Sequence, residues 1–229
     1  MITTETTVGE IVRSAPARSR IFEQLGIDYC CGGKKSLAEA CRSKRLDAAT
    51  VVAMLSALET QPAADSANPA AMTLTELCDH IEQVHHFYLN QELPRLDFMT
   101  RKVAAVHGAD EPRLLEIRRV FEDFSTAMLS HTKEENEQVF PAIRQLDRGA
   151  NPSASGALKA ALDKLEHEHD HAGAALAQFK SLTDNYAPPE WACNTFRALY
   201  DGLARLEQDT HQHVHKENNV LFPRVLAEA

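Results

Sequence analysis

The chain has 229 residues and a formal net charge of −9, and it carries no basic stripe suited to nucleic acid or an anionic membrane surface. Ala and Leu are abundant, glycines number only nine, and strand-like alternation is scarce, so the sequence predicts an all-α protein. A charged-then-apolar signal pattern is absent, and no apolar run approaches the ~20 residues that span a bilayer. These observations predict a cytoplasmic protein that does not enter the membrane.

Residues 1–60 predict a small domain of short helices. Good N-cap residues precede three of these helices, and a glycine follows the other one. The predicted helices are Val8–Arg13 after Thr7, Pro16–Leu25 before Gly26, Leu37–Lys44 in a capping box of Ser36 and Glu39, and a helix capped by Asp47 that ends at about Glu59.

Residues 61–71 are small, polar and proline-bearing, which is typical of a linker. The remaining segment, 72–229, predicts a bundle of four long helices. Short connections rich in Gly, Asn and Pro separate these helices, so sequential neighbours should be antiparallel. Their expected bounds are about Thr73–His107, Glu111–Leu146, Ser153–Asp184 and Pro189–Ala227.

The element His-x3-Glu-Asn-x3-Phe-Pro occurs twice in this segment. The copies begin at His131 and His213, and their glutamates are Glu135 and Glu217. A His and a Glu four residues apart lie on one face of a helix, and the Phe-Pro pair is expected to end it. Two such helices facing each other could present two imidazoles and two carboxylates to a pair of metal ions.

Each predicted helix has an apolar stripe that turns polar at particular positions. On the second helix Ile117, Phe121, Phe124 and Met128 are followed, at the same spacing, by His131 and Glu135; the other helices place His86, His169, His213 and Glu217 in equivalent stripes. Buried carboxylates without compensation are costly, so these positions predict metal ligands. A bundle held by His–Glu ion pairs is the alternative, which the matching Asn and Phe-Pro of the two copies disfavour.

The predicted ligands are therefore four imidazoles and two carboxylates, a set that suits iron or manganese and leaves coordination positions open. They are His86, His131, Glu135, His169, His213 and Glu217. His85 remains an alternative to His86. His107 lies 21 residues further along the same helix and could join the site only if that helix breaks.

The other histidines near the ligands fall on different faces of their helices. His167 and His171 point away from His169, and His211 and His215 point away from His213, so all four are expected to be solvated. Glu134 and Glu168 flank ligands and could support them, although each alone is expected to be a solvated residue.

The loop Ile27–Gly33 contains the adjacent Cys30 and Cys31, followed by two glycines and two lysines. Adjacent cysteines cannot readily form a disulfide with each other, and the nearby lysines could lower the pKa of the thiols and make them reactive. The alternative is that one thiol is packed and the other incidental. Cys41, Cys78 and Cys193 are expected to be small buried residues within helices.

The four C-terminal helices resemble hemerythrin-like domains. With the loop Asp28–Gly33 ahead of the paired His-x3-Glu helices, nearly the whole chain resembles the di-iron iron–sulfur cluster repair proteins, the ScdA-type or RIC family. The resemblance implies a non-haem centre of two iron ions, bridged by Glu135 and Glu217 and completed by the four imidazoles. It also identifies Cys30 and Cys31 with the family's cysteine pair.

The function that this resemblance implies is repair of iron–sulfur clusters damaged by oxidative or nitrosative stress, through iron donation or nitric oxide handling. Cys30 and Cys31 would act as a redox or iron-relay element. The implied partners are damaged iron–sulfur proteins, nitric oxide or oxygen species, and an electron donor of unspecified identity; a homodimer is left open. The alternatives are an oxygen or nitric oxide carrier or sensor, which would have no use for paired thiols, and an enzyme such as a nitric oxide reductase.

Overall fold

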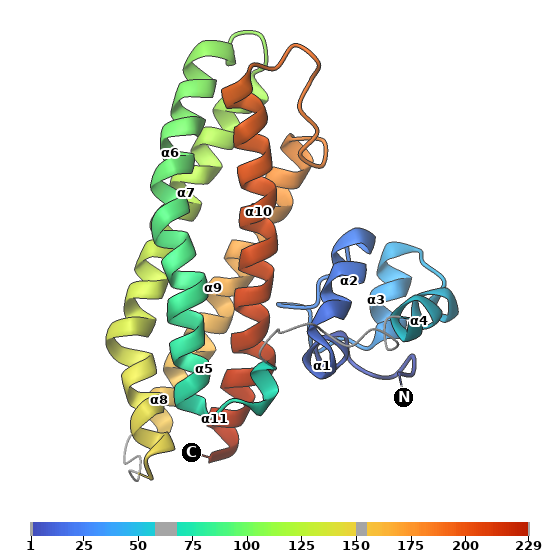
Figure 1. Cartoon of the computed structure of the whole chain (residues 1–229), viewed down its shortest axis with the longest axis vertical. Coiled ribbons are helices and arrows are strands. Elements are labelled where there is room, and N and C mark those ends of the chain that lie inside the picture. The colour runs from blue at the N-terminus through green and yellow to red at the C-terminus, as the bar shows by residue number, and fades with distance from the viewer. Residues whose placement is uncertain (1, 58–67, 150–154, 229) are drawn as a thin grey trace. The chain divides into compact units, whose positions relative to one another are not determined.

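A computed structural model describes residues 2–57, 68–149 and 155–228 of the chain (Figure 1). Within these ranges the protein is built of helices, with one isolated bridge between Thr7 and Ser36 and no strand, as the composition predicts. The chain divides into two compact units. The first comprises residues 1–78, 143–155 and 211–229, and the second comprises residues 79–142 and 156–210.

Short capped helices form the N-terminal part of the first unit. Thr7 and Ser36 each form a capping box, Asp47 accepts the backbone N–H of Thr50 at 2.8 Å, and Gly26 ends a helix with a φ of 65°. These caps confirm the predicted helices, which are α1 (Val8–Ser14), a 3-10 turn (Pro16–Arg18) leading into α2 (Ser19–Leu25), α3 (Leu37–Lys44) and α4 (Ala48–Ala57). The predicted end at Glu59 and most of the 61–71 linker lie outside the described residues.

An apolar core holds these short helices together. Val8, Phe22, Leu37 and Leu55 are each fully buried within it. A core of this size is small, so the capping boxes at the two helix N-termini contribute an appreciable share of the local stability, typically ~1 kcal/mol each.

The second unit is a four-helix bundle, whose long helices lie side by side in Figure 1. Its core takes leucines from the first helix, Phe121 and Phe124 from the second, Phe179 from the third and Phe196 from the fourth. The predicted apolar stripes are buried throughout. The helices are α6 (Phe87–His107), α7 (Arg113–Glu134), and the parts of α9 (Ser155–Leu182) and α10 (Asn194–Lys216) that belong to this unit.

In the described part of the chain, three segments of π-helix interrupt the long helices, which the sequence did not predict. They are Glu82–His86 between α5 (Leu74–Ile81) and α6, Glu135–Val139 between α7 and α8 (Phe140–Asp147), and Glu217–Leu221 between α10 and α11 (Phe222–Glu228). In such a segment the backbone bonds to the carbonyl five residues back, so each turn is wider by one residue.

The repeated Phe-Pro pair does not end its helix, contrary to expectation. The N–H of Phe140 donates to the carbonyl of Glu135, and that of Phe222 donates to the carbonyl of Glu217. Proline lacks the N–H that would continue the ladder, but the widened turn ahead of it lets the chain pass the ring and remain helical.

Two helix bounds also differ from the prediction. The third helix ends at Leu182 because Asp184, Asn185 and Tyr186 adopt left-handed φ angles of 52°, 61° and 60°. The fourth begins at Asn194 and not at Pro189, because the guanidinium of Arg197 bonds to the carbonyls of the preceding turn.

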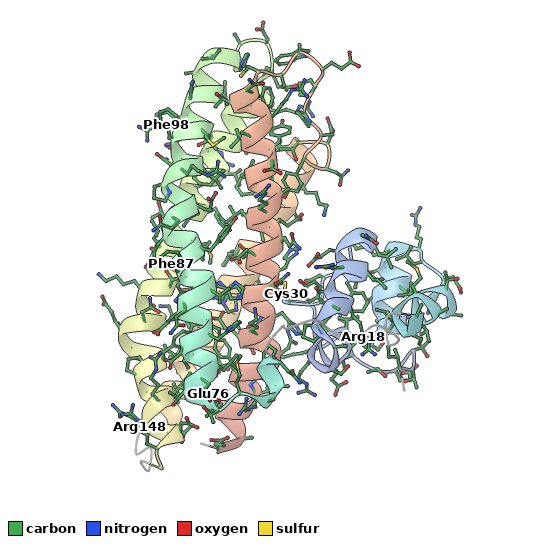
Figure 2. The ribbon with its side chains drawn as sticks, viewed as in Figure 1. Arg18, Cys30, Glu76, Phe87, Phe98 and Arg148 are labelled. Carbon is green, nitrogen blue, oxygen red and sulfur yellow. The ribbon has the colours of Figure 1, made fainter. Side chains whose placement is uncertain are left out.

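The surface of α6 carries large exposed apolar side chains, including Phe87, Phe98 and Val106. Phe87 and Phe98 point outward from the helix (Figure 2), and each is 63% exposed. No helix in the described part of the chain is both long and apolar enough to cross a membrane.

Candidate metal centre

Four of the six predicted ligands lie in the second unit, and all four are buried. Oε2 of Glu135 is 3.3 Å from Nε2 of His86 and 3.4 Å from Nε2 of His131. Nε2 of His169 is 3.0 Å from Nε2 of His131. One carboxylate and three imidazoles from three helices therefore gather their ligand atoms in one buried place.

The outward nitrogens of two of these imidazoles are held by hydrogen bonds. Nδ1 of His86 lies 2.7 Å from Oδ1 of Asn136, and Nδ1 of His131 lies 2.8 Å from Oε2 of Glu168. Both partners are acceptors, so each Nδ1 carries the proton and each Nε2 keeps its lone pair for a metal ion. The ring of Phe140 stacks on His86 at 5.5 Å, so Asn136 and Phe140 of the repeat both position this imidazole.

Glu168 contacts a predicted ligand, whereas the sequence suggested that it is only a solvated residue. Burial raises the pKa of its carboxyl, but the hydrogen bond and charge of His131 and the charge of Lys164 outweigh this, and the pKa is lowered on balance. The ionised carboxylate accepts a hydrogen bond from Nδ1–H of His131, so Glu168 favours the tautomer that metal binding needs.

The remaining two predicted ligands belong to the first unit. Nε2 of His213 lies 2.9 Å from Oε1 of Glu217, and both side chains are fully buried. Glu217 begins a π segment, as Glu135 does in the first copy of the repeat. π segments of this kind occur frequently at functional sites, where they redirect individual side chains.

The predicted ligands thus form one buried group in each unit. In the second unit Glu135 lies beside His86 and His131, and His169 lies beside His131. In the first unit Glu217 lies beside His213. Imidazole nitrogens with buried carboxylate oxygens and no thiolate are donors that suit iron.

Two histidines that the sequence left open lie outside these groups. His85 is buried, and its Nδ1 is 2.9 Å from Oδ1 of Asp209. The helix carrying His107 is unbroken from residue 87, and Nε2 of His107 is 3.3 Å from Sγ of Cys193. The structure thus favours His86 over His85, and it places His107 beside a thiol.

The predicted exposure is confirmed for His167 and His171 and is wrong for His215. His167 and His171 are exposed on α9, as expected. His215 is only 6% exposed, because its ring packs at 5.4 Å against the ring of Tyr29, and burial lowers its pKa to about 4. His211 is partly buried and also faces Tyr29. Helical periodicity could not reveal a covering residue from a distant part of the chain.

Cys193 also departs from the prediction. It is exposed and directly precedes α10, whose start at Asn194 leaves it outside the helix. Cys41 and Cys78 are buried within α3 and α5, as expected.

The cysteine loop belongs to the first unit, where Figure 2 labels Cys30. The Sγ atoms of Cys30 and Cys31 are 3.8 Å apart, and Sγ of Cys30 is 3.2 Å from Oδ1 of Asp28. The side chain of Asn219 donates to the carbonyl of Cys30 at 3.0 Å and thereby ties the loop to the last π segment. Asp28, Cys30 and Cys31 form a further group that could hold a metal ion.

The expectation of a lowered thiol pKa is wrong for Cys30. The hydrogen bond with Cys31, burial, and the carboxylate of Asp28 raise the pKa of the Cys30 thiol well above its usual range. The sequence suggested lysine neighbours, but the folded loop turns this thiol inward toward an acid.

Both parts of the chain match known protein families. Residues 4–59 match ScdA_N, a domain of unknown function, and residues 79–225 match the hemerythrin HHE cation binding domain. The second match contains all six predicted ligands.

Curated relatives match over nearly the full length. The chain is 36% identical over 222 residues to the iron–sulfur cluster repair protein ScdA of Staphylococcus haemolyticus, covering 97% of this chain and 98% of that one. It is 35% identical to the iron–sulfur cluster repair protein YtfE of Musicola paradisiaca, covering 97% and 96%, and 37% identical to YtfE of Escherichia coli, covering 96% of each. The chain therefore belongs to the ScdA and YtfE family of iron–sulfur cluster repair proteins.

Proposed function

We propose that this protein repairs iron–sulfur clusters damaged by oxidative or nitrosative stress, using a centre of two iron ions. The observation that carries the proposal is that each glutamate of the repeat is buried beside imidazoles, Glu135 beside those of His86 and His131 and Glu217 beside that of His213. Family membership supplies the repair function, since the relatives bear that name. When bound, the irons would supply redox chemistry and open positions for a small ligand.

At this centre some residues would bind the metal ions and others would position those ligands. His86, His131, His169 and His213 would be terminal ligands, and the two glutamates would bridge. Asn136 and Glu168 hold the Nδ1 protons of their imidazoles and keep the facing nitrogens available. Burial excludes water from the carboxylates, which strengthens their attraction for cations.

The cysteine pair would act as an iron relay or redox element during repair. The chemistry of the loop supports this role, because Asp28, Cys30 and Cys31 place one carboxylate and two thiols within 4.8 Å of one another. Such a small set of ligands could hold a metal ion transiently. The raised pKa of Cys30 keeps this thiol protonated at neutral pH, so metal arrival would have to displace its proton.

Metal analysis of protein purified without added metal tests the centre. We expect about two iron ions per chain and near-ultraviolet charge-transfer bands in the oxidised protein. Glu135→Ala should remove one iron or both, whereas Glu134→Ala, which deletes the neighbouring carboxylate on Lys164, should keep both. Zinc in place of iron, or two irons retained by Glu135→Ala, would contradict the proposed ligands.

A repair assay tests the function itself. A [4Fe–4S] enzyme inactivated with peroxide should regain activity when the iron-loaded protein is added. The Cys30→Ser, Cys31→Ser double variant should keep its iron and lose most of this effect. Cys193→Ser is the matched control, since this thiol is exposed and lies in the second unit. Full repair by the double variant would remove the thiols from the mechanism.

A second candidate is reduction or reversible binding of nitric oxide or oxygen. A cleft of about 590 Å³ supports it, because its lining includes apolar residues such as Phe124 and Met128 and reaches His131. Steady conversion of nitric oxide to nitrous oxide by the iron-loaded protein would favour an enzyme, while reversible binding without turnover would favour a carrier or sensor.

A further inference from the structure

Two exposed histidines on α9 have no part in the site described above. His167 and His171 are one helical turn apart, and their Nε2 atoms are separated by 3.2 Å. Their rings lie 4.7 Å apart at an angle of 74°. The pair thus points two imidazole nitrogens at a common place on the surface of the bundle.

This separation matches the distance between two nitrogen ligands of one transition-metal ion. With a metal–nitrogen distance of about 2.05 Å, an angle of about 100° at the metal reproduces the observed 3.2 Å. Two histidines at i and i+4 on one helix face are also the arrangement by which helical His-x3-His motifs bind zinc. One imidazole of the pair can donate its Nε2–H to the other, and a divalent ion bound by both Nε2 atoms would replace this hydrogen bond, with the ring protons on Nδ1.

One member of the pair also borders the cleft that reaches the buried His131. His171 lines this cleft together with Asp123, Glu168 and His131. Glu168 in turn bonds to Nδ1 of His131. A cation held by the surface pair would therefore lie beside a cleft whose lining includes two carboxylates and a proposed iron ligand.

We propose that His167 and His171 form a second, surface metal site that binds one divalent first-row transition-metal ion, and that in the cell this site passes iron(II) between solvent and the buried centre. The transfer role rests on the proposed function, whereas the metal site does not. Only two protein ligands hold the ion, and iron(II) binds such nitrogen sites more weakly than zinc or copper. Weak binding suits a transfer site, because such a site must release its ion.

Calorimetric titration of the iron-loaded protein with Zn²⁺ tests the site. Wild type should bind one Zn²⁺ that the His167→Gln, His171→Gln double variant does not, and each single variant should weaken binding at least tenfold. Asp170→Asn, which removes an exposed charge from the same helix, is the matched control and should change affinity less than threefold. Equal Zn²⁺ binding by wild type and double variant would overturn the proposal.

The rate of iron uptake tests the transfer role. Iron-free wild type and double variant would be mixed anaerobically with Fe²⁺, and bound iron followed with time. We expect the double variant to load several times more slowly and to reach the same final iron content. Equal loading rates would overturn the transfer role. A wild type that takes up no iron yet binds Zn²⁺ at the pair would instead overturn the proposed di-iron centre.

Discussion

Oδ1 of Asn136 lies 2.7 Å from Nδ1 of His86, so the residue that follows Glu135 in the repeat orients an imidazole on a different helix. This contact gives the asparagine in the first copy of the repeat a positioning role. The amide oxygen fixes the proton on Nδ1 and leaves Nε2 facing Glu135.

Asn136→Ala should therefore weaken iron binding by about 10- to 100-fold, because the His86 ring loses the acceptor that sets its tautomer. The measurement is competition for iron with a chelator of known affinity. Asn136→Asp retains an acceptor and should recover most of the loss. Equal affinities of the alanine variant and wild type would show that the hydrogen bond does not position the ligand.

Glu168→Ala should weaken iron binding for a related reason, since the proton on Nδ1 of His131 would lose its charged acceptor. We expect a loss of the same order, measured by the same competition. Glu134→Ala removes a carboxylate that contacts Lys164 and serves as the control. If both variants lose affinity equally, the effect comes from net charge and not from the contact with His131.

His215 should make the free energy of unfolding depend on pH. Burial lowers its pKa from 6.5 to about 4, so between these values the unfolded chain binds the proton more tightly than the folded chain. Stability from this residue is complete above pH 6.5 and is lost as the pH falls toward 4, by up to about 1.4 kcal/mol per pH unit.

His215→Gln cannot titrate, so its unfolding free energy should fall less steeply than that of wild type across this range. Urea denaturation of both proteins at several pH values between 4 and 7 measures the difference. Groups that titrate in both proteins cancel in this comparison. Parallel curves would mean that His215 is protonated as readily in the folded protein as in the unfolded chain.

Asn219 should control how readily Cys30 reacts. Its amide donates to the carbonyls of Cys30 and Tyr29, and the thiol is only 4% exposed. Asn219→Ala should speed alkylation of Cys30 several-fold, as followed by peptide mass spectrometry. Cys41, which is 1% exposed in α3, is an internal control. Equal acceleration at both thiols would indicate general unfolding of the unit.

Gly33 should tolerate a side chain poorly. A Cβ at this position would overlap the side chain of Asn219, so Gly33→Ala should lower the free energy of unfolding by about 1–3 kcal/mol. Gly156→Ala is the matched control, because nothing lies within 4 Å of its Cβ and alanine favours the helix. Thermal denaturation distinguishes the two: the first variant should melt earlier than wild type and the second no earlier.

Periodicity predicted much of this structure because it is a local property of a helix. The stripe from Ile117 to Glu135 is buried at each of its six positions, and the capping residues Thr7 and Ser36 begin their helices as expected. The repeat directly revealed His131 and His213 with their glutamates.

Features that depend on distant residues could not be predicted in this way. The burial of His215 requires Tyr29, and the role of Glu168 requires the ring of His131 from another helix. The π segments could not be predicted either, because a side-chain pattern does not specify whether a carbonyl accepts from the N–H four or five residues ahead. The repeated Phe-Pro accompanies two of the three segments, and the segment Glu82–His86 lacks it.

The π segment at Glu135 has a consequence for altering this protein by deletion. The π segment contains one residue more than an α-helix of the same length. The side chains beyond Val139 therefore point in directions rotated by about 100° from those they would have in a uniform α-helix. Removing a single residue there would restore regular geometry and turn Ile143, now fully buried, away from its present surroundings. Loop regions usually tolerate length changes best, but here the most length-sensitive points of the chain lie inside its longest helices.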